Sequence, residues 1–159
     1  MGIWRAFTGL FFKHSGLGDT EQARAKRPKP TILAIDDDLK FLEAMKALLT
    51  DAGFSVLTSS SGPKGLDTLQ NAGGDIRAVL LDFHMPGFDG AETLQYVRRL
   101  NPKVKIVAMT GVDVTALPPS FRGGVDLFIQ KPFPVSQLIA ALHKLVGDET
   151  QGDVVPSRG

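Results

Sequence analysis

Residues 79–90 read VLLDFHMPGFDG, and within this stretch an apolar run ends at one carboxylate, that of Asp82. Burying an unpaired charge costs on the order of several kcal/mol, so a strand core gains nothing from this aspartate. Pro86-Gly87 behind it predicts a turn, and Asp89 is suited to cap a helix. Either Asp82 is an isolated turn residue, or the strand serves to hold its carboxylate at a reactive site.

Three other apolar runs are followed directly by residues that can do chemistry. Asp36 and Asp37 follow the first run, Thr110 follows a later one and Lys131 follows the last. In a parallel sheet the carboxyl ends of all strands share one edge, and ligands bind in the crevice there. We therefore expect these side chains to meet Asp82 at that edge, which favours the reactive-site interpretation.

The chemistry that this set of side chains suits is phosphoryl transfer. Clustered carboxylates repel one another unless a cation lies among them, and hard oxygen ligands of this kind suit Mg²⁺ or Mn²⁺. An ammonium and a hydroxyl beside the metal would bind a phosphoryl group, whose transfer depends mainly on positioning and charge neutralisation. A central carboxylate can also be the nucleophile that accepts the group covalently. Asp38 is better suited to cap the helix that follows it than to bind the metal.

Alternating short apolar runs and longer amphipathic segments predict repeated βα units around these residues. The expected strands are 31–35, 54–58, 76–81, 104–109 and 125–129, and the expected helices are 39–52, 63–72, about 90–100 and 134–146. In the first helix an apolar stripe is formed by Phe41, Leu42, Met45, Leu48 and Leu49. Pro118-Pro119 and Gly123-Gly124 interrupt residues 112–124, so the fourth helix should be short or irregular. The prediction is a single (βα)5 domain with a five-stranded parallel sheet and helices on both faces.

The composition of the 159 residues, 43% hydrophobic and 22% charged, is that of one globular domain. No apolar run is long enough to span a membrane, and the absence of cysteine excludes disulfides and thiolate metal sites. Residues 1–29 carry six basic and two acidic residues, a balance of +4, whereas the rest carries twelve basic and fifteen acidic, a balance of −3. We expect a basic and aromatic N-terminal extension (1–29), a folded domain (30–147) and a flexible tail (148–159).

The N-terminal extension places five apolar residues on one helical stripe, namely Ile3, Trp4, Phe7, Leu10 and Phe11. Such a stripe suits docking on a membrane surface or on a partner protein, and the alternative is a disordered extension. Ala6 departs from the myristoylation pattern, which disfavours lipidation. The basic segment RAKRPKP is interpreted as a solvated linker, and no direct DNA binding is expected. The expected location is the cytoplasm, peripheral to the inner membrane if residues 1–29 bind lipid.

Four segments, in order along the chain, resemble the receiver domain of two-component response regulators of the chemotaxis-regulator type. They are ILAIDDD (32–38), LLDFHMPGFDG (80–90), IVAMTG (106–111) and DLFIQKPF (126–133). Any one of them is a weak signal, but four in order at strand ends are a strong one. The resemblance implies a flavodoxin-like fold with strand order 2-1-3-4-5. It also implies a phosphoacceptor signalling domain, not an enzyme beyond self-catalysed phosphotransfer and dephosphorylation.

The resemblance assigns the acidic residues to phosphorylation and to Mg²⁺ binding. Asp82 takes the place of the phosphoacceptor, and Asp36 and Asp37 take that of the acidic pair that holds the metal together with Asp82. The backbone carbonyl of His84 takes the place of a further metal ligand. The side chains of His84 and Val112 correspond to those that flank the path of the water that hydrolyses the acyl phosphate.

The resemblance also assigns the residues that respond to phosphorylation. Thr110 takes the place of the hydroxyl that bonds the phosphoryl group, and Lys131 that of the lysine that pairs with it. Lys131-Pro132 matches a cis peptide of the family. Phe128 occupies the position of the aromatic switch residue, without the hydroxyl of the commoner tyrosine. This departure and the irregular fourth helix leave the route of signal output open.

The function implied is a stand-alone receiver that switches the binding of a downstream protein. It would accept a phosphoryl group on Asp82 from a phosphohistidine of a sensor histidine kinase or a histidine phosphotransfer protein. One alternative is a haloacid-dehalogenase-like phosphatase with Asp36 as nucleophile, since residues 36–38 satisfy its D-x-D pattern; Lys40 departs from that pattern, and the Asp82 turn stays unexplained. The other alternative is a receiver-like scaffold that is not phosphorylated, against which the complete set of site residues argues.

Overall fold

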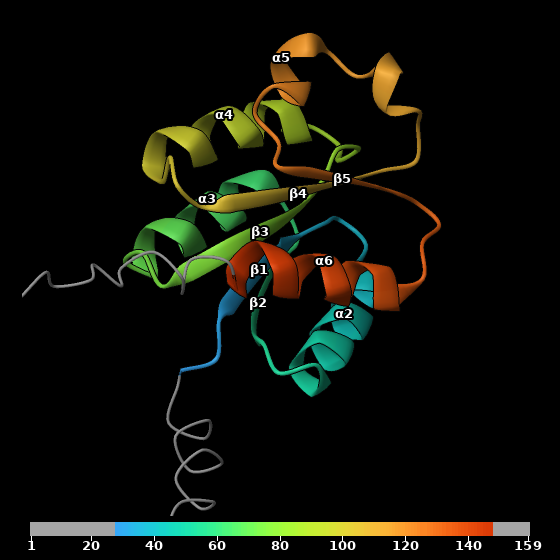
Figure 1. The fold of residues 1–159 in the computed structure, drawn as a ribbon. Helices are drawn as coiled ribbons and strands as arrows, with labels where there is room; N and C mark the ends of the chain where they lie inside the picture. Colours follow the sequence, from blue (N-terminus) through green and yellow to red (C-terminus); the bar gives the residue numbers. More distant parts are fainter. Residues whose placement is uncertain (1–27, 148–159) are drawn as a thin grey trace, which may run out of the picture.

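Five parallel strands form one sheet in the computed structural model, which describes residues 28–147 (Figure 1). The strands are β1 (Thr31–Ile35), β2 (Ser55–Ser59), β3 (Ile76–Asp82), β4 (Lys105–Thr110) and β5 (Leu127–Gln130). The helices are α2 (Leu39–Asp51), α3 (Gly62–Asn71), α4 (Gly90–Leu100), α5 (Pro119–Arg122) and α6 (Val135–Gly147), with a 3-10 turn η1 (Val114–Ala116). The sheet order β2-β1-β3-β4-β5 confirms the flavodoxin-like fold expected from the sequence.

Both faces of the sheet are buried, because successive side chains of each strand point to opposite sides. Ile32 and Ala34 of β1 pack in the cluster under α2 and α6, whereas Leu33 and Ile35 pack in the cluster under α3, α4 and α5. Figure 1 shows these two helical layers on either side of the sheet. The strands are therefore continuous apolar runs, as expected for a parallel sheet covered on both faces.

Several predicted strand and helix boundaries are wrong by one or two residues, and two of these differences have a clear cause. Phe54 was expected to begin a strand, but its backbone N–H donates to Leu49 O, 3.0 Å away, and β2 begins one residue later. Asp126 was expected inside the last strand. Its carboxylate instead accepts from Ile106 N, 2.8 Å away, and β5 begins at Leu127. Leu48, assigned to the apolar stripe of the first helix, is 42% exposed.

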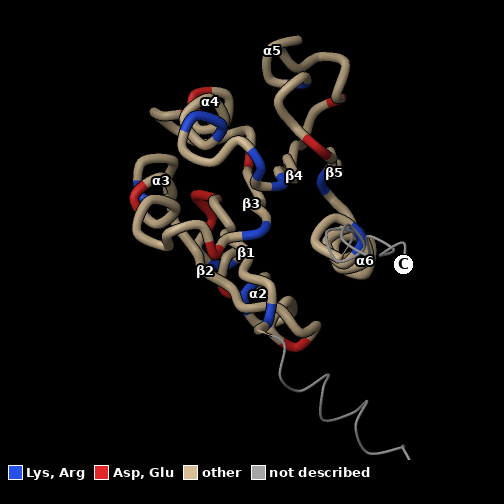
Figure 2. Tube along the Cα trace, turned by 60° about the vertical axis from the view of Figure 1, so that its left-hand side comes forward, with Lys and Arg blue, Asp and Glu red and all other residues tan. Residues whose placement is uncertain are grey.

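Arg98 joins the last turn of α4 to the segment that leads into β5. Its guanidinium donates to the carbonyl oxygens of Gly124, Pro102 and Val104, and it pairs with Asp126 at 2.6 Å. Figure 2 shows the basic positions on α4 in blue. Positive charge in the last turn of a helix also interacts favourably with its dipole.

The segment between β4 and β5 contains the three residues of η1 and the four of α5, which confirms a short and irregular fourth helix. Pro118 and Pro119 limit the helical hydrogen bonding that this segment can form. Leu117 and Phe121 are both 2% exposed and anchor the segment in the cluster under α3, α4 and α5. Hydrophobic anchoring thus positions this part of the chain, since regular helix contributes little.

Within residues 28–147 no helix is both long and apolar enough to cross a membrane. Several expectations fall on residues outside the described part of the chain. They are the apolar stripe of Ile3, Trp4, Phe7, Leu10 and Phe11, the docking role of the N-terminal extension, and the flexible tail 148–159.

Gly90 allows the start of α4 to approach the end of β3 very closely. A Cβ atom at this position would lie 2.6 Å from the carbonyl oxygen of Asp82 and 2.7 Å from the Cα of Phe83. Both neighbouring atoms belong to the backbone, so neither can move away as a flexible side chain would. Asp89 fixes the same helix start through a capping box with Glu92.

We predict that Gly90→Ala lowers the free energy of unfolding by about 1–3 kcal/mol through overpacking. Gly123→Ala is the matched control, because a Cβ there would meet Pro119 O at an ordinary 3.5 Å. It should change stability by less than about 1 kcal/mol. Urea unfolding of both variants measures the difference, and equal midpoints would contradict the close contact at Gly90.

Candidate functional site

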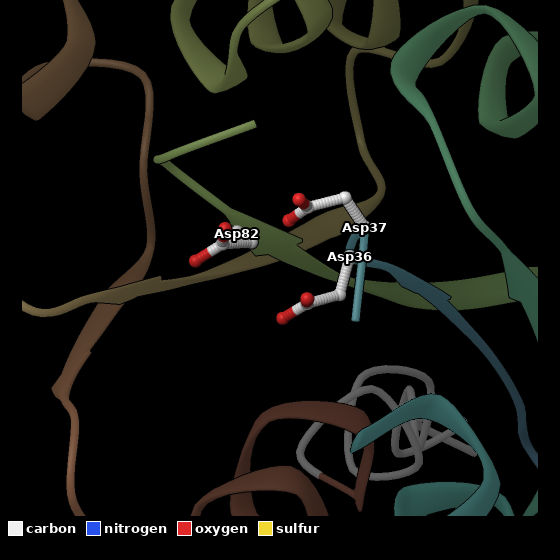
Figure 3. Close-up of side chains that lie close together, drawn as sticks. All are labelled: Asp36, Asp37 and Asp82. Carbon is white, nitrogen blue, oxygen red and sulfur yellow. The ribbon is translucent and has the colours of Figure 1, made fainter. Parts of the chain in front are cut away.

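The ends of β1 and β3 bring three carboxylates together at the carboxyl edge of the sheet (Figure 3). One oxygen atom each of Asp36, Asp37 and Asp82 lies within 4.8 Å of the others. The register of the sheet explains this, since β1 and β3 are neighbours and Ile35 pairs with Leu81. Asp36 follows Ile35 and Asp82 follows Leu81, so the ends of these two strands place Asp36 beside Asp82.

Lys131, directly after β5, supplies a positive charge to this cluster. Its Nζ donates to Asp36 Oδ2 at 2.8 Å and to Asp82 Oδ1 at 3.1 Å. The two carboxylate side chains are only 2% and 7% exposed, against 29% for that of Lys131. The backbone N–H of Lys131 donates to Thr110 O at 2.7 Å, which fixes the lysine to the end of β4. Four strand ends are thus linked to one site.

Burial and charge determine the protonation of this cluster. Burial raises the pKa of Asp82, Lys131 lowers it, and the charges of Asp36 and Asp37 raise it again; the net change is upward. Burial lowers the pKa of Lys131, but its hydrogen bond with Asp36 and the charges of Asp82 and Asp36 outweigh burial and raise it. The lysine therefore stays charged, and it pairs with two of the three carboxylates, those of Asp36 and Asp82. A second cation at this place would relieve the remaining repulsion.

The two adjacent aspartates after β1 differ in their surroundings. Asp36 is 1% exposed, and both of its oxygens accept hydrogen bonds, Oδ1 from Asp38 N at 2.9 Å and Oδ2 from Lys131. Asp37 is exposed, and its carboxylate forms no hydrogen bond or ion pair with residues 28–147. The cluster thus offers hard oxygen ligands, with the whole Asp37 carboxylate unengaged by other residues of 28–147, and this donor set fits Mg²⁺.

Asp38 caps a helix instead of offering its carboxylate to a metal, as the sequence predicted. Its Oδ1 accepts from Lys40 N at 2.9 Å and from Phe41 N at 3.2 Å, so the side chain caps α2. Because the cap satisfies two N–H groups at the helix start, it also fixes where the first turn of α2 begins.

Within residues 28–147, no side-chain hydrogen bond joins the remaining predicted residues to the carboxylate cluster. Thr110 is fully buried, and its hydroxyl accepts from Val112 N at 3.1 Å. Phe128 is partly buried, with its ring centroid 6.1 Å from that of Phe121 in α5. His84 is exposed, and its ring packs edge-on against Phe83. Their roles in phosphorylation, including that of the His84 carbonyl, stay predictions.

Sequence reasoning missed one contact of the cluster, that of Phe41. The Nζ atom of Lys131 lies 4.5 Å from the centroid of the Phe41 ring. Phe41 belongs to the apolar stripe of the first helix, and its position in that stripe predicts only that it packs in the core. Only its place in the turn that directly follows Asp36 and Asp37 hints at a position beside the cluster.

Comparison with known proteins identifies the family. The family model for the response regulator receiver domain matches residues 32–143, which includes every site residue discussed above. The chain belongs to this family. Receiver domains are phosphoacceptor signalling domains of two-component systems, so the resemblance seen in the sequence is confirmed.

Two curated relatives are longer than this chain. The DNA-binding transcriptional regulator NtrC of Klebsiella pneumoniae is 29% identical over 113 residues, which are 70% of this chain and 24% of NtrC. The response regulator MprA of Mycobacterium sp. (strain KMS) is 32% identical over 116 residues, 72% of this chain and 50% of MprA. The chain thus matches half or less of the length of these two relatives.

Solved receiver structures align along nearly their whole length. A response regulator receiver domain protein from Clostridium thermocellum aligns with a TM-score of 0.70 and 27% identity, covering 76% of this chain and 96% of that one. The response regulator TrrA of Thermotoga maritima, solved in complex with Mg²⁺-BeF, aligns with a TM-score of 0.65 and 27% identity. That alignment covers 74% of this chain and 99% of TrrA.

Asp37→Asn and Asp36→Asn make the same chemical change at two adjacent carboxylates, and we predict different results. Asp37→Asn should weaken Mg²⁺ binding about tenfold or more. It should leave the metal-free stability unchanged or slightly higher, because it removes a charge that repels Asp82. Asp36→Asn should lower the metal-free stability by about 1–3 kcal/mol, because the amide replaces a charge that Lys131 neutralises.

Titration calorimetry with MgCl₂, together with urea unfolding in the presence of a chelator, separates the two effects. The assignment would be contradicted if Asp37→Asn bound Mg²⁺ as tightly as the wild type. It would also be contradicted if Asp36→Asn were the more stable of the two variants.

Proposed function

We propose that this receiver domain accepts a phosphoryl group on Asp82 from a phosphohistidine donor and thereby switches its binding to a downstream protein. The donor would be a sensor histidine kinase or a histidine phosphotransfer protein. The observation that carries the proposal is the place of Asp82 at the end of β3, 3.1 Å from the Lys131 ammonium and within 4.8 Å of two further carboxylates. The relative TrrA, solved with Mg²⁺-BeF, supports a Mg²⁺-dependent reaction.

In the proposed reaction an oxygen of the Asp82 carboxylate forms a new bond to phosphorus as the nitrogen–phosphorus bond of the donor breaks. Asp82 Oδ1 is engaged by Lys131, whereas Oδ2 forms no hydrogen bond with residues 28–147 and is free to attack. Mg²⁺, held by Asp36, Asp37, Asp82 and the His84 carbonyl, would supply neutralisation of the phosphoryl charge.

Lys131 and Thr110 are the residues proposed to respond to the new phosphoryl group. When Asp82 becomes an acyl phosphate its carboxylate charge moves outward, and the Lys131 ammonium can follow it to the phosphoryl oxygens. The Thr110 hydroxyl, bonded to Val112 in this structure, would exchange that partner for the phosphoryl group. Phe128, partly buried beside Phe121, would then turn further inward and change the surface near α5.

The rival nucleophile, Asp36, is poorly placed for attack because both of its oxygens already accept hydrogen bonds. Incubation with acetyl phosphate and Mg²⁺, followed by intact-mass measurement and peptide mapping, distinguishes the three functions considered. A phosphoryl group on Asp82 supports the receiver, one on Asp36 supports the phosphatase, and none on either supports the scaffold.

We predict that Asp82→Asn folds and takes up no phosphoryl group, because the amide keeps the shape of the side chain but is not a nucleophile. The intact mass of the variant should stay unchanged under conditions that add one phosphoryl group to the wild type. Undiminished labelling of Asp82→Asn would remove Asp82 from its assigned role.

We also predict a slowly hydrolysed acyl phosphate. The side chain of Val112 is apolar and cannot activate water, and the His84 ring is exposed and packs on Phe83. Because general-base help is worth about 100-fold only in the right geometry, His84→Ala should change the decay rate less than about twofold. Val112→Glu should accelerate decay, since it supplies a carboxylate that can orient water. Slower decay in His84→Ala would show that the ring assists hydrolysis.

The proposal implies that the downstream partner is a protein, but it does not identify that protein. NtrC is described as a DNA-binding transcriptional regulator, whereas residues 28–147 of this chain form the receiver fold alone. Action as a stand-alone receiver, without direct DNA binding, therefore stays a prediction.

A further inference from the structure

The Lys131 ammonium has three N–H donors, and three neighbouring groups lie close to it. Two of them are used by Asp36 Oδ2, at 2.8 Å, and by Asp82 Oδ1, at 3.1 Å. The third neighbour is the ring of Phe41, over which Nζ lies at 4.5 Å from the centroid. This distance is well within the range of about 6 Å at which a cation is attracted to the face of an aromatic ring.

The Phe41 ring is held in place from two directions. Asp38 caps α2 and accepts from the backbone N–H of Phe41 itself, at 3.2 Å, so the cap fixes the backbone that carries the ring. Phe133, two residues after Lys131, packs edge-on against the Phe41 ring with a centroid distance of 6.4 Å and an interplanar angle of 89°. The ring therefore connects the first turn of α2 to the segment that carries the lysine.

We propose that Phe41 is a positioning residue for phosphoryl transfer, and that its ring face directs the Lys131 ammonium toward Asp36 and Asp82. This inference rests on the proposed function of Asp82 as phosphoacceptor. Phe41 acts through Lys131 and does not contact the reacting atoms. A lysine side chain is long and flexible, and that of Lys131 is 29% exposed, so it has other rotamers available in solvent. The ring favours the one that points into the cluster.

The ring face also suits the movement that the reaction requires of Lys131. A hydrogen-bond acceptor in place of the ring would hold the ammonium at one angle, and the bond would weaken as the ammonium turned. Attraction to a ring face depends much less on direction, so Nζ can move from the carboxylate of Asp82 toward a phosphoryl group without losing its third contact. Phe41 brings no charge of its own, and it therefore does not compete with the carboxylates for the lysine.

Two variants separate the ring face from the volume of the side chain. Phe41→Leu keeps an apolar side chain but removes the ring, and Phe41→Tyr keeps the ring. In wild type and Phe41→Tyr the ε-methylene protons of Lys131 should show an upfield ring-current shift in NMR spectra, and Phe41→Leu should lose it. Phosphorylation of Asp82 by subsaturating acetyl phosphate should be about three- to tenfold slower in Phe41→Leu and within about twofold of wild type in Phe41→Tyr.

The Mg²⁺ affinity of Phe41→Leu should stay within about twofold of wild type, since the ring lies against Lys131, which is not one of the proposed metal ligands. Unfolding midpoints identify any general loss of structure, and Phe41→Met replaces Phe41→Leu if that variant does not fold. A lower stability with wild-type phosphorylation rate and wild-type Lys131 shift would assign Phe41 to the core alone and overturn the inference.

Equal rates in wild type and Phe41→Leu, or a rate in Phe41→Tyr as low as that in Phe41→Leu, would likewise overturn it. Absence of labelling in the wild type would instead overturn the proposed function, and the role of Phe41 in the reaction with it. The two failures are therefore distinguishable, because only the second removes the signal of the wild type.

Discussion

The arrangement of the site depends on one ammonium group that neutralises two buried carboxylates. Asp36 and Asp82 are nearly inaccessible to water, and Lys131 contacts both of them. Buried charges of one sign are tolerated only when they are paired and hydrogen-bonded. The strands that deliver these three residues are not all neighbours, since β4 lies between β3 and β5. The order of the strands in the sheet is therefore what brings the ammonium of Lys131 to the two buried carboxylates that it neutralises.

The pairing of Lys131 with Asp36 and Asp82 also makes the two adjacent carboxylates, Asp36 and Asp37, differ. Lys131 and the backbone N–H of Asp38 together use both oxygens of Asp36, so this residue contributes first to holding the cluster in shape. Asp37, one residue further, also points into the cluster, but it is exposed and its carboxylate accepts no hydrogen bond from residues 28–147. Two adjacent residues of one type therefore differ in how far the protein already engages their carboxylates.

The sequence predicted those features that follow from local patterns. Apolar runs located every strand within two residues, and the alignment of strand ends predicted that Asp36, Asp37, Asp82 and Lys131 would meet. Features that depend on a distant contact were not predictable in this way. Phe54 leaves its strand because it completes the turn after α2, and Asp126 does so because it pairs with Arg98. The ring of Phe41 reaches Lys131 across ninety positions of the chain, and no spacing rule connects the two.

The short segment that joins β4 to β5 has a consequence for the pace of signalling. A helix of four residues has almost no stability of its own, because helix nucleation is costly and few bonds follow it. Two buried side chains, Leu117 and Phe121, hold this segment, while the sheet beneath it is held by continuous backbone ladders. Segments of this kind open locally at a small fraction of the free energy that global unfolding requires. We therefore expect the chain between Val114 and Arg122 to open more readily than the sheet beneath it.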